Sequence, residues 1–163
     1  MTGDTAMTTE EAWFNYHGTM DYGSAVRDLF ERLPDLEPMY REQFSYLADE
    51  ELPYVVFGSF LVPVLEIALK ARDAGRVTSI CAYIEEAAED ARTDAQLENL
   101  LRVEIGEWLS GTELEADVAP YLGEQTERVS GYVLGLATQR ISPRTERERR
   151  DHESRLLDGI RRK

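Results

Sequence analysis

The sequence predicts an all-α domain, a multi-helix bundle or short repeat-like stack of six to seven helices followed by an Arg-rich C-terminal helix or tail. Apolar residues recur at helical spacing in successive segments, most clearly over 97–109, and glycines and prolines separate these segments. The 163 residues are 42% hydrophobic and 31% charged, which suits one globular core. We therefore expect a disordered N-terminus over 1–7, an acidic helical domain over 8–140 and a charged helix or tail over 141–163.

Three short helices are predicted for the N-terminal third of the chain. The first begins after Thr8, a residue type that caps helix N-termini, and contains Trp13. Ser24 is a suitable cap for the second helix, and Pro34 ends it because proline rarely continues a helix. Asp35 then stands at the start of the third. Each of these helices has apolar residues for one buried face.

Longer helices are predicted between residues 54 and 138. Residues 54–69 are apolar on nearly every side, which predicts a buried central helix. Pro63 should kink or interrupt that helix because it has no N–H to donate. An amphipathic helix with acidic side chains on its outer face follows, and Thr93 is the predicted cap of the helix over 97–109. A last core helix is expected over 124–138.

The charge of the chain is strongly acidic and unevenly distributed. The formal net charge is −14, yet residues 140–163 hold nine Lys or Arg and five acids, a net of +4, so the remaining residues carry −18. A body with this charge repels nucleic-acid phosphates and attracts basic proteins. We expect a basic protein as the partner and no direct binding of nucleic acid by the body.

Neither a membrane segment nor a targeting peptide is expected. The longest apolar stretch, 52–65, contains two prolines and one glycine and is shorter than the ~20 apolar residues that span a bilayer. The start of the chain, over 1–11, carries acids and no Lys or Arg, unlike a targeting peptide. The expected location is the cytoplasm.

Signatures of catalysis are missing from the sequence. It has no glycine-rich phosphate loop, no His-Glu-x-x-His motif, no nucleophile elbow and no cysteine cluster. The two histidines, His17 and His152, fall in segments expected to be mobile, which gives a histidine-based site little support. Cys81 has apolar neighbours and is predicted to be an inert core thiol. We expect no catalytic residue, no cofactor and no metal.

A dense acidic cluster is the first candidate for a partner-binding surface. Six acids lie within fourteen residues, opposed only by Arg92, and we predict that they face outward. Later acids between Glu113 and Glu127 are candidates to extend this surface. Trp13 is the predicted exposed anchor, because Trp is enriched among binding hot spots, whereas Trp108 is predicted to be core. The six acids are Glu85, Glu86, Glu89, Asp90, Asp94 and Glu98.

A metal or catalytic carboxylate pair is the alternative use of these acids. Glu85 and Glu89 lie on one predicted helix, and Glu104 and Glu107 lie on the next, so pairs of carboxylates can meet there. A di-iron bundle also needs inward Glu-x-x-His motifs, which the sequence lacks. Acids on helix exteriors are usually solvated, so we favour a solvated or partner-binding surface.

Three segments in the middle half of the chain carry a family resemblance. They read LPYVVFGSF at 52–60, CAYIEE at 81–86 and LENLLRVEIGEWL at 97–109. Together with the length and acidity of the chain, they resemble the small acidic helical immunity proteins of bacterial polymorphic-toxin and contact-dependent inhibition loci. The resemblance implies a protein that binds and occludes the active or substrate surface of a cognate toxin, often a basic nuclease, without a reaction of its own.

Two further functions stay open at this point. A nucleic-acid mimic would present carboxylates in place of phosphates and bind many basic proteins. A structural or adaptor protein would instead pair its Arg-rich segment, residues 144–163, with another chain or with a second copy as a homodimer.

Overall fold

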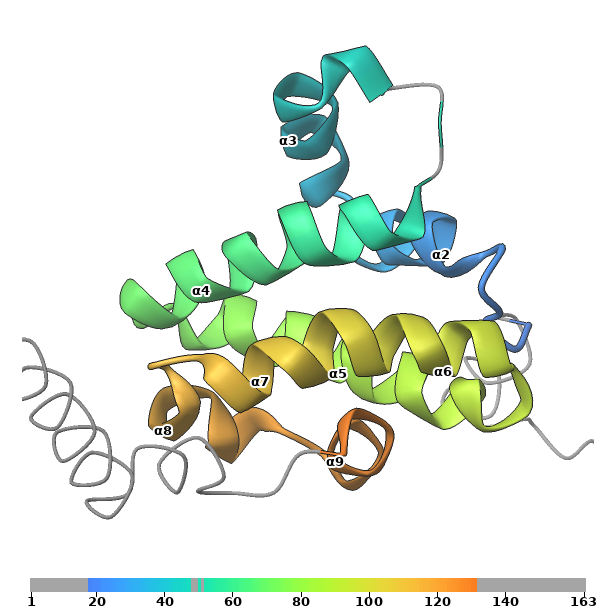
Figure 1. Cartoon of the computed structure of the whole chain (residues 1–163). Coiled ribbons are helices and arrows are strands. Elements are labelled where there is room, and N and C mark those ends of the chain that lie inside the picture. The colour runs from blue at the N-terminus through green and yellow to red at the C-terminus, as the bar shows by residue number, and fades with distance from the viewer. Residues whose placement is uncertain (1–17, 48–49, 51, 132–163) are drawn as a thin grey trace, which may run out of the picture.

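Helices make up all the regular structure in the part of the chain that the computed structural model describes, residues 18–47, 50 and 52–131. No strand occurs among these residues (Figure 1). Apart from the short 3-10 turn at Ser45–Leu47, helical turns that follow one another directly combine into seven continuous helices. The prediction of an all-α fold with six to seven helices is therefore confirmed. The α-helices are α2 (Ala25–Arg32), α3 (Leu36–Gln43), α4 (Val62–Lys70), α5 (Ala74–Asp90), α6 (Ala95–Leu101), α7 (Glu107–Gly111), α8 (Glu115–Val118) and α9 (Glu124–Ser130). The 3-10 turns are η1 (Ser45–Leu47), η3 (Ala91–Thr93) and η5 (Ala119–Tyr121), and the π-helices are η2 (Val55–Leu61) and η4 (Arg102–Gly106).

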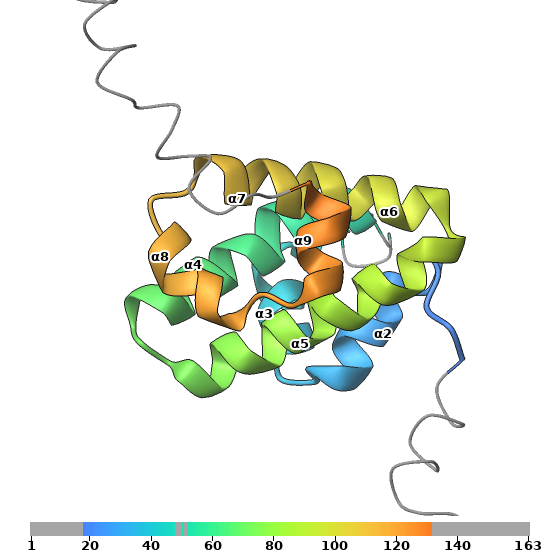
Figure 2. The same cartoon turned by 90° about the horizontal axis from the view of Figure 1, so that it is seen from below.

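Helix α5 is the element around which the others pack. It contacts α2, α4, α6 and α9. Seen from below, α9 crosses between α5 and the continuous rod formed by α6, η4 and α7 (Figure 2). Helix α3 projects on the opposite side, above α2 and α4 in Figure 1. None of the helices in the described part of the chain is long and apolar enough to cross a membrane.

One apolar core is shared by these helices. Its largest fully buried side chains include Phe57 and Phe60 of η2 and Tyr83 of α5. The Tyr83 hydroxyl donates a 2.7 Å hydrogen bond to the carbonyl of Ala25, so its polar atom is paired. Cys81 is buried as well, and burial raises the pKa of its thiol to about 12. The prediction that Cys81 is a core thiol is confirmed.

The central helix changes its hydrogen-bond pattern beside its proline. The π-helix η2 passes directly into α4, which begins at Val62, one residue before Pro63. Since Pro63 has no N–H to donate, the switch falls where a regular ladder would lose a bond. The predicted interruption is thus a change of helix type within one continuous helix. The second π-helix, η4, packs against η2.

The predicted cap of α6 was wrong by one residue. Asp94, and not Thr93, has the extended backbone of an N-cap, and its carboxylate accepts hydrogen bonds from the N–H groups of Gln96 (2.8 Å) and Leu97 (3.2 Å). The Thr93 hydroxyl instead donates to the carbonyl of Asp90. The reason is the 3-10 turn η3, which carries the chain one residue further before α6 begins.

The last described helix is shorter than predicted. Helix α9 stops at Ser130, and Gly131 follows in the left-handed conformation, with a φ of 63°, which ends a helix. Residues 132–138, which the prediction included in this helix, lie outside the described part. The same holds for the segment around Trp13 and for the Arg-rich tail.

Candidate functional site

Glu85 lies in α5, and its carboxylate caps helix α9. Its oxygens accept hydrogen bonds from the backbone N–H groups of Gln125 (2.9 Å) and Thr126 (2.8 Å) and from the Thr126 hydroxyl (2.7 Å). Gly123 permits this approach, because a Cβ there would collide with the carboxylate. Burial raises the pKa of Glu85, but these hydrogen bonds outweigh it and the pKa lies below its ordinary value. The outward placement predicted for Glu85 is corrected: it is half-buried and joins α5 to α9.

Asp90 and Asp94 hold the chain that precedes α2. Asp90 accepts a 2.8 Å hydrogen bond from the N–H of Met20, and Asp94 accepts one of 2.7 Å from the N–H of Tyr22 while it also caps α6. The bond from Tyr22 is the main reason why the pKa of Asp94 is lowered. Both side chains are half-buried and bind backbone groups, so their predicted outward placement is also corrected.

The other acids of the predicted cluster have ordinary surface positions. Glu86 forms an ion pair with Arg32 of α2, and Glu89 forms one of 3.2 Å with Arg92. Glu98 is half-buried and has no hydrogen bond or ion pair with a described residue. Five of the six acids therefore have partners within the described part of the chain, and the role of the cluster in binding stays a prediction.

Exposed carboxylates without a described partner occur instead on α7, α8 and α9 and in the turn before α8; α8 and α9 lie on the same side of the bundle, nearest the viewer in Figure 2. All five are exposed, and none has a hydrogen bond or ion pair with a described residue. We call this surface the acidic end and define it by Glu107, Glu113, Asp117, Glu124 and Glu127.

None of the described Lys or Arg side chains forms an ion pair with the acidic end. Every ion pair among them joins residues between Arg27 and Arg92. Beyond Arg92 the described chain contains only two basic residues. Arg102 bonds to the Asn99 side chain, and Arg128 bonds to the Gln125 side chain and to a backbone carbonyl of α5. Among the described residues, no Lys or Arg therefore forms an ion pair with a carboxylate of the acidic end.

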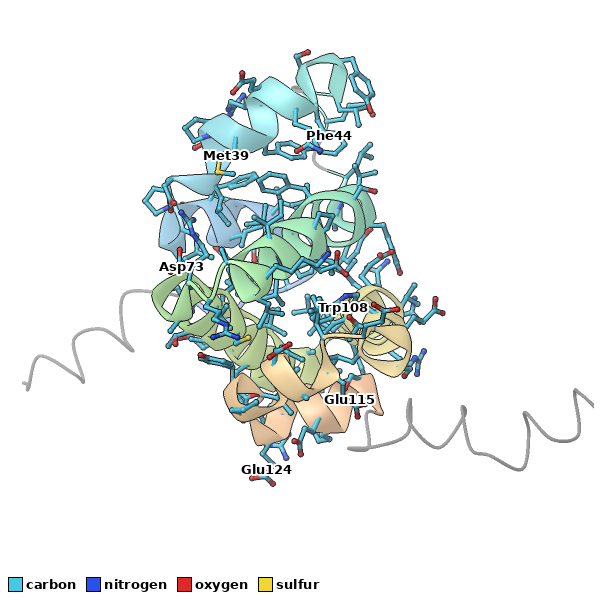
Figure 3. The ribbon with its side chains drawn as sticks, turned by 90° about the vertical axis from the view of Figure 1, so that its left-hand side faces the viewer. Met39, Phe44, Asp73, Trp108, Glu115 and Glu124 are labelled. Atoms are coloured by element: carbon cyan, nitrogen blue, oxygen red, sulfur yellow. The ribbon has the colours of Figure 1, made fainter. Side chains whose placement is uncertain are left out.

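Half-buried apolar side chains accompany these acids along the chain. Trp108 follows Glu107, and Leu114 follows Glu113, while Tyr121 and Leu122 precede α9; all four pack against the core. The Trp108 ring N–H donates a 2.7 Å hydrogen bond to Glu66 of α4, which fixes the orientation of the indole. Figure 3 shows the labelled Trp108, Glu115 and Glu124 following one another from α7 through α8 to α9. Aromatic side chains are enriched among the residues that contribute most to binding.

Glu104 lies where the two π-helices meet. A Cβ on Gly58 of η2 would collide with its carboxylate, so the glycine leaves the space that Glu104 occupies. Burial, and secondarily the charge of Glu107, raises the pKa of Glu104 above its ordinary value. Within the described ranges, no group of three or more His, Cys, Asp or Glu side chains is arranged to hold a metal ion.

Replacing Glu104 with Gln should stabilise the protein at neutral pH. A carboxyl group whose pKa is raised by folding favours the folded state below its ordinary pKa, and this contribution is lost as pH rises through the folded pKa. Gln stays neutral, so the gain should be present at about pH 7 and absent at about pH 4. Thermal unfolding midpoints across this range measure it, with the exposed Glu42→Gln as the control. A midpoint at or below that of the wild type at neutral pH would contradict the prediction.

The chain matches one family in a comparison with known protein families. Residues 26–131 match the family described as a domain of unknown function, DUF7674. The chain belongs to the DUF7674 family. The matched part begins in α2 and ends at Gly131, so the DUF7674 domain includes the acidic end and excludes Trp13 and the Arg-rich tail. No match was found among curated proteins, and none among solved structures.

Proposed function

We propose that this DUF7674 protein is a non-catalytic binding module whose acidic end binds a basic protein. The supporting observation is that five exposed carboxylates of α7, α8, α9 and the turn before α8 have no partner among the described residues, while half-buried apolar side chains occur in the same segments. Carboxylates without a partner in the protein are available to pair with a cationic partner. The neighbouring apolar groups supply contacts of the kind that dominate binding energy.

An immunity-type inhibitor is the form of this proposal that we favour. The resemblance of the segments at 52–60, 81–86 and 97–109 supports it. The net charge of −18 outside 140–163 also supports it, because such a charge speeds association with a basic enzyme such as a nuclease toxin and makes the rate sensitive to salt. An inhibitor of this kind acts by covering the partner's active or substrate surface and needs no catalytic group.

Charge reversal at the acidic end tests the proposal. One triple variant carries Glu113→Lys, Glu124→Lys and Glu127→Lys, and a matched triple variant carries Glu31→Lys, Glu42→Lys and Glu50→Lys, which lie on the α2–α3 side. Both change the net charge by the same amount. In affinity capture from a lysate of the source organism, the wild type and the matched variant should retain one dominant basic protein. The acidic-end variant should lose at least about tenfold of it, because several close charge pairs are removed.

The other outcomes point to other functions. Equal loss from both variants would contradict a role for the acidic end, since net charge alone would then explain binding. Capture of many basic proteins that all dissociate at high salt would indicate a nucleic-acid mimic. Capture of a second copy of the chain and nothing else would indicate a self-associating adaptor. Circular dichroism of each variant checks that it is folded.

A further inference from the structure

The acidic end is an unpartnered face built from helix ends, and its chemistry defines what fits it. It presents five unpaired carboxylates together with partly exposed apolar side chains of α7 and of the turns before α8 and α9. A ligand for this face brings several cations and a few apolar side chains grouped on one side. Most other described carboxylates already accept hydrogen bonds or form ion pairs, so charge complementarity directs a cationic ligand to this end.

The chain leaves the described body beside this same face. The Ser130 carbonyl oxygen lies so close to Gly106 that a Cβ on the glycine would stand 2.6 Å from it, and Glu107 is the next residue after Gly106. Two members of the acidic end, Glu124 and Glu127, lie on α9 itself, shortly before the chain passes Gly131. Whatever follows Gly131 therefore starts next to the acidic end.

The C-terminal segment has the composition that this face requires. Residues 144–163 contain eight Lys or Arg against five acids. Leu156, Leu157 and Ile160 are the aliphatic residues of the segment, and their spacing is that of one helix face. From 131 to 144 the chain spans up to about 43 Å when extended, so its length does not prevent the segment from reaching any part of the acidic end.

We propose that residues 144–163 are an intramolecular ligand of the acidic end and compete there with the basic partner. This inference rests on the proposed function and adds its regulation. The cationic charge of the segment is what the unpaired carboxylates require, and its three aliphatic residues supply the apolar component. Since a short tether gives an effective concentration in the millimolar range, the segment occupies the face until a tighter ligand displaces it. The affinity measured for a partner is lowered by the occupied fraction.

A synthetic peptide of residues 144–163 is the probe that tests this inference on full-length protein. A tail variant with Arg147→Gln, Arg149→Gln and Arg150→Gln weakens the internal ligand. We expect the labelled peptide to bind this variant at least about tenfold more tightly than the wild type in fluorescence anisotropy at low salt, because the wild-type face is already occupied.

Three further comparisons make the test specific. Adding Glu113→Lys, Glu124→Lys and Glu127→Lys to the tail variant should abolish peptide binding, whereas adding the matched α2–α3 reversals should leave most of it. A peptide of the same composition with its three aliphatic residues dispersed should bind more weakly, since it loses its apolar face. Equal loss of binding with the two sets of reversals would overturn the inference, because it would show unspecific attraction.

Failure of the inference and failure of the proposed function are distinguishable. Equal affinity of the peptide for the wild type and the tail variant, or no binding to either, overturns the internal ligand. Capture of the basic partner is measured separately and does not depend on the peptide. If the partner is captured through the acidic end while the peptide does not bind, the proposed function stands without this regulation.

Discussion

Replacing Gly106 with Ala should reduce the free energy of unfolding by about 2–3 kcal/mol, because the new methyl group would overlap backbone atoms of α9. A Cβ at this position would lie 2.6 Å from the Ser130 carbonyl oxygen and 3.2 Å from its Cα. A flexible side chain could turn away from such a contact, but a backbone carbonyl moves only with its helix. The gain in helix propensity from Gly to Ala, about 1 kcal/mol, offsets part of the cost. Displacing α9 would also move Glu124 and Glu127 of the acidic end.

Urea unfolding followed by circular dichroism measures this effect, and Gly111→Ala is the matched control. Gly111 is the last residue of α7, lies five positions further along the same rod, and has no atom within 4 Å of an added Cβ. Its replacement should therefore not destabilise the protein, and the gain in helix propensity should raise stability by at most about 1 kcal/mol. If the two variants unfolded at the same urea concentration, the close packing of α9 on η4 would be contradicted.

The helices were predictable from the sequence because local periodicity reflects burial. Leu97, Leu100 and Leu101 recur at helical spacing, and all three are fully buried in the structure. The π-helices η2 and η4, which pack against each other, were not predicted, because a hydrophobic pattern does not distinguish a π-helical turn from an α-helical one. Pro63 signalled an interruption, but its sequence position alone did not specify the type of helix on either side.

The placement of the acidic side chains was harder to predict, because the density of acids in the sequence does not distinguish a solvated carboxylate from one that caps a distant helix. Glu85 accepts hydrogen bonds from Thr126, which lies about forty positions further along the chain, and a local sequence pattern cannot predict a contact at that separation. A usable signal for the acidic end does exist. No Lys or Arg occurs between Arg102 and Arg128, so Glu127, which precedes Arg128, is the one acid of that stretch with a basic residue next to it, whereas the predicted cluster contains Arg92.

Replacing Glu85 with Ala should reduce the free energy of unfolding by about 2–4 kcal/mol at neutral pH, because three hydrogen bonds to the start of α9 are lost. Thr126 is 1% exposed, so its hydroxyl and N–H would be left in the interior without their acceptor. Glu89→Ala is the control. Its ion pair with Arg92 is exposed, and its loss should cost no more than about 0.5 kcal/mol.

The pH dependence of this effect follows from the lowered pKa of Glu85. A carboxyl group whose pKa is lowered by folding stabilises the folded state above its ordinary value of 4.5, and that contribution is lost as pH falls through the folded pKa. The difference between the wild type and Glu85→Ala, measured by urea unfolding, should therefore narrow in acid. A loss no larger than that of Glu89→Ala, or one independent of pH, would contradict the capping role.

The capping role also determines how binding data on Glu85 are interpreted. Loss of the Glu85 carboxylate weakens the attachment of α9 to α5, and with it the placement of Glu124 and Glu127, so a Glu85 variant should bind a basic partner less well even if Glu85 never touches that partner. Reduced binding that is restored when α9 is stabilised would identify Glu85 as a positioning residue. The exposed acids of the acidic end, whose replacement disturbs no hydrogen bond to a described residue, report contact with the partner directly.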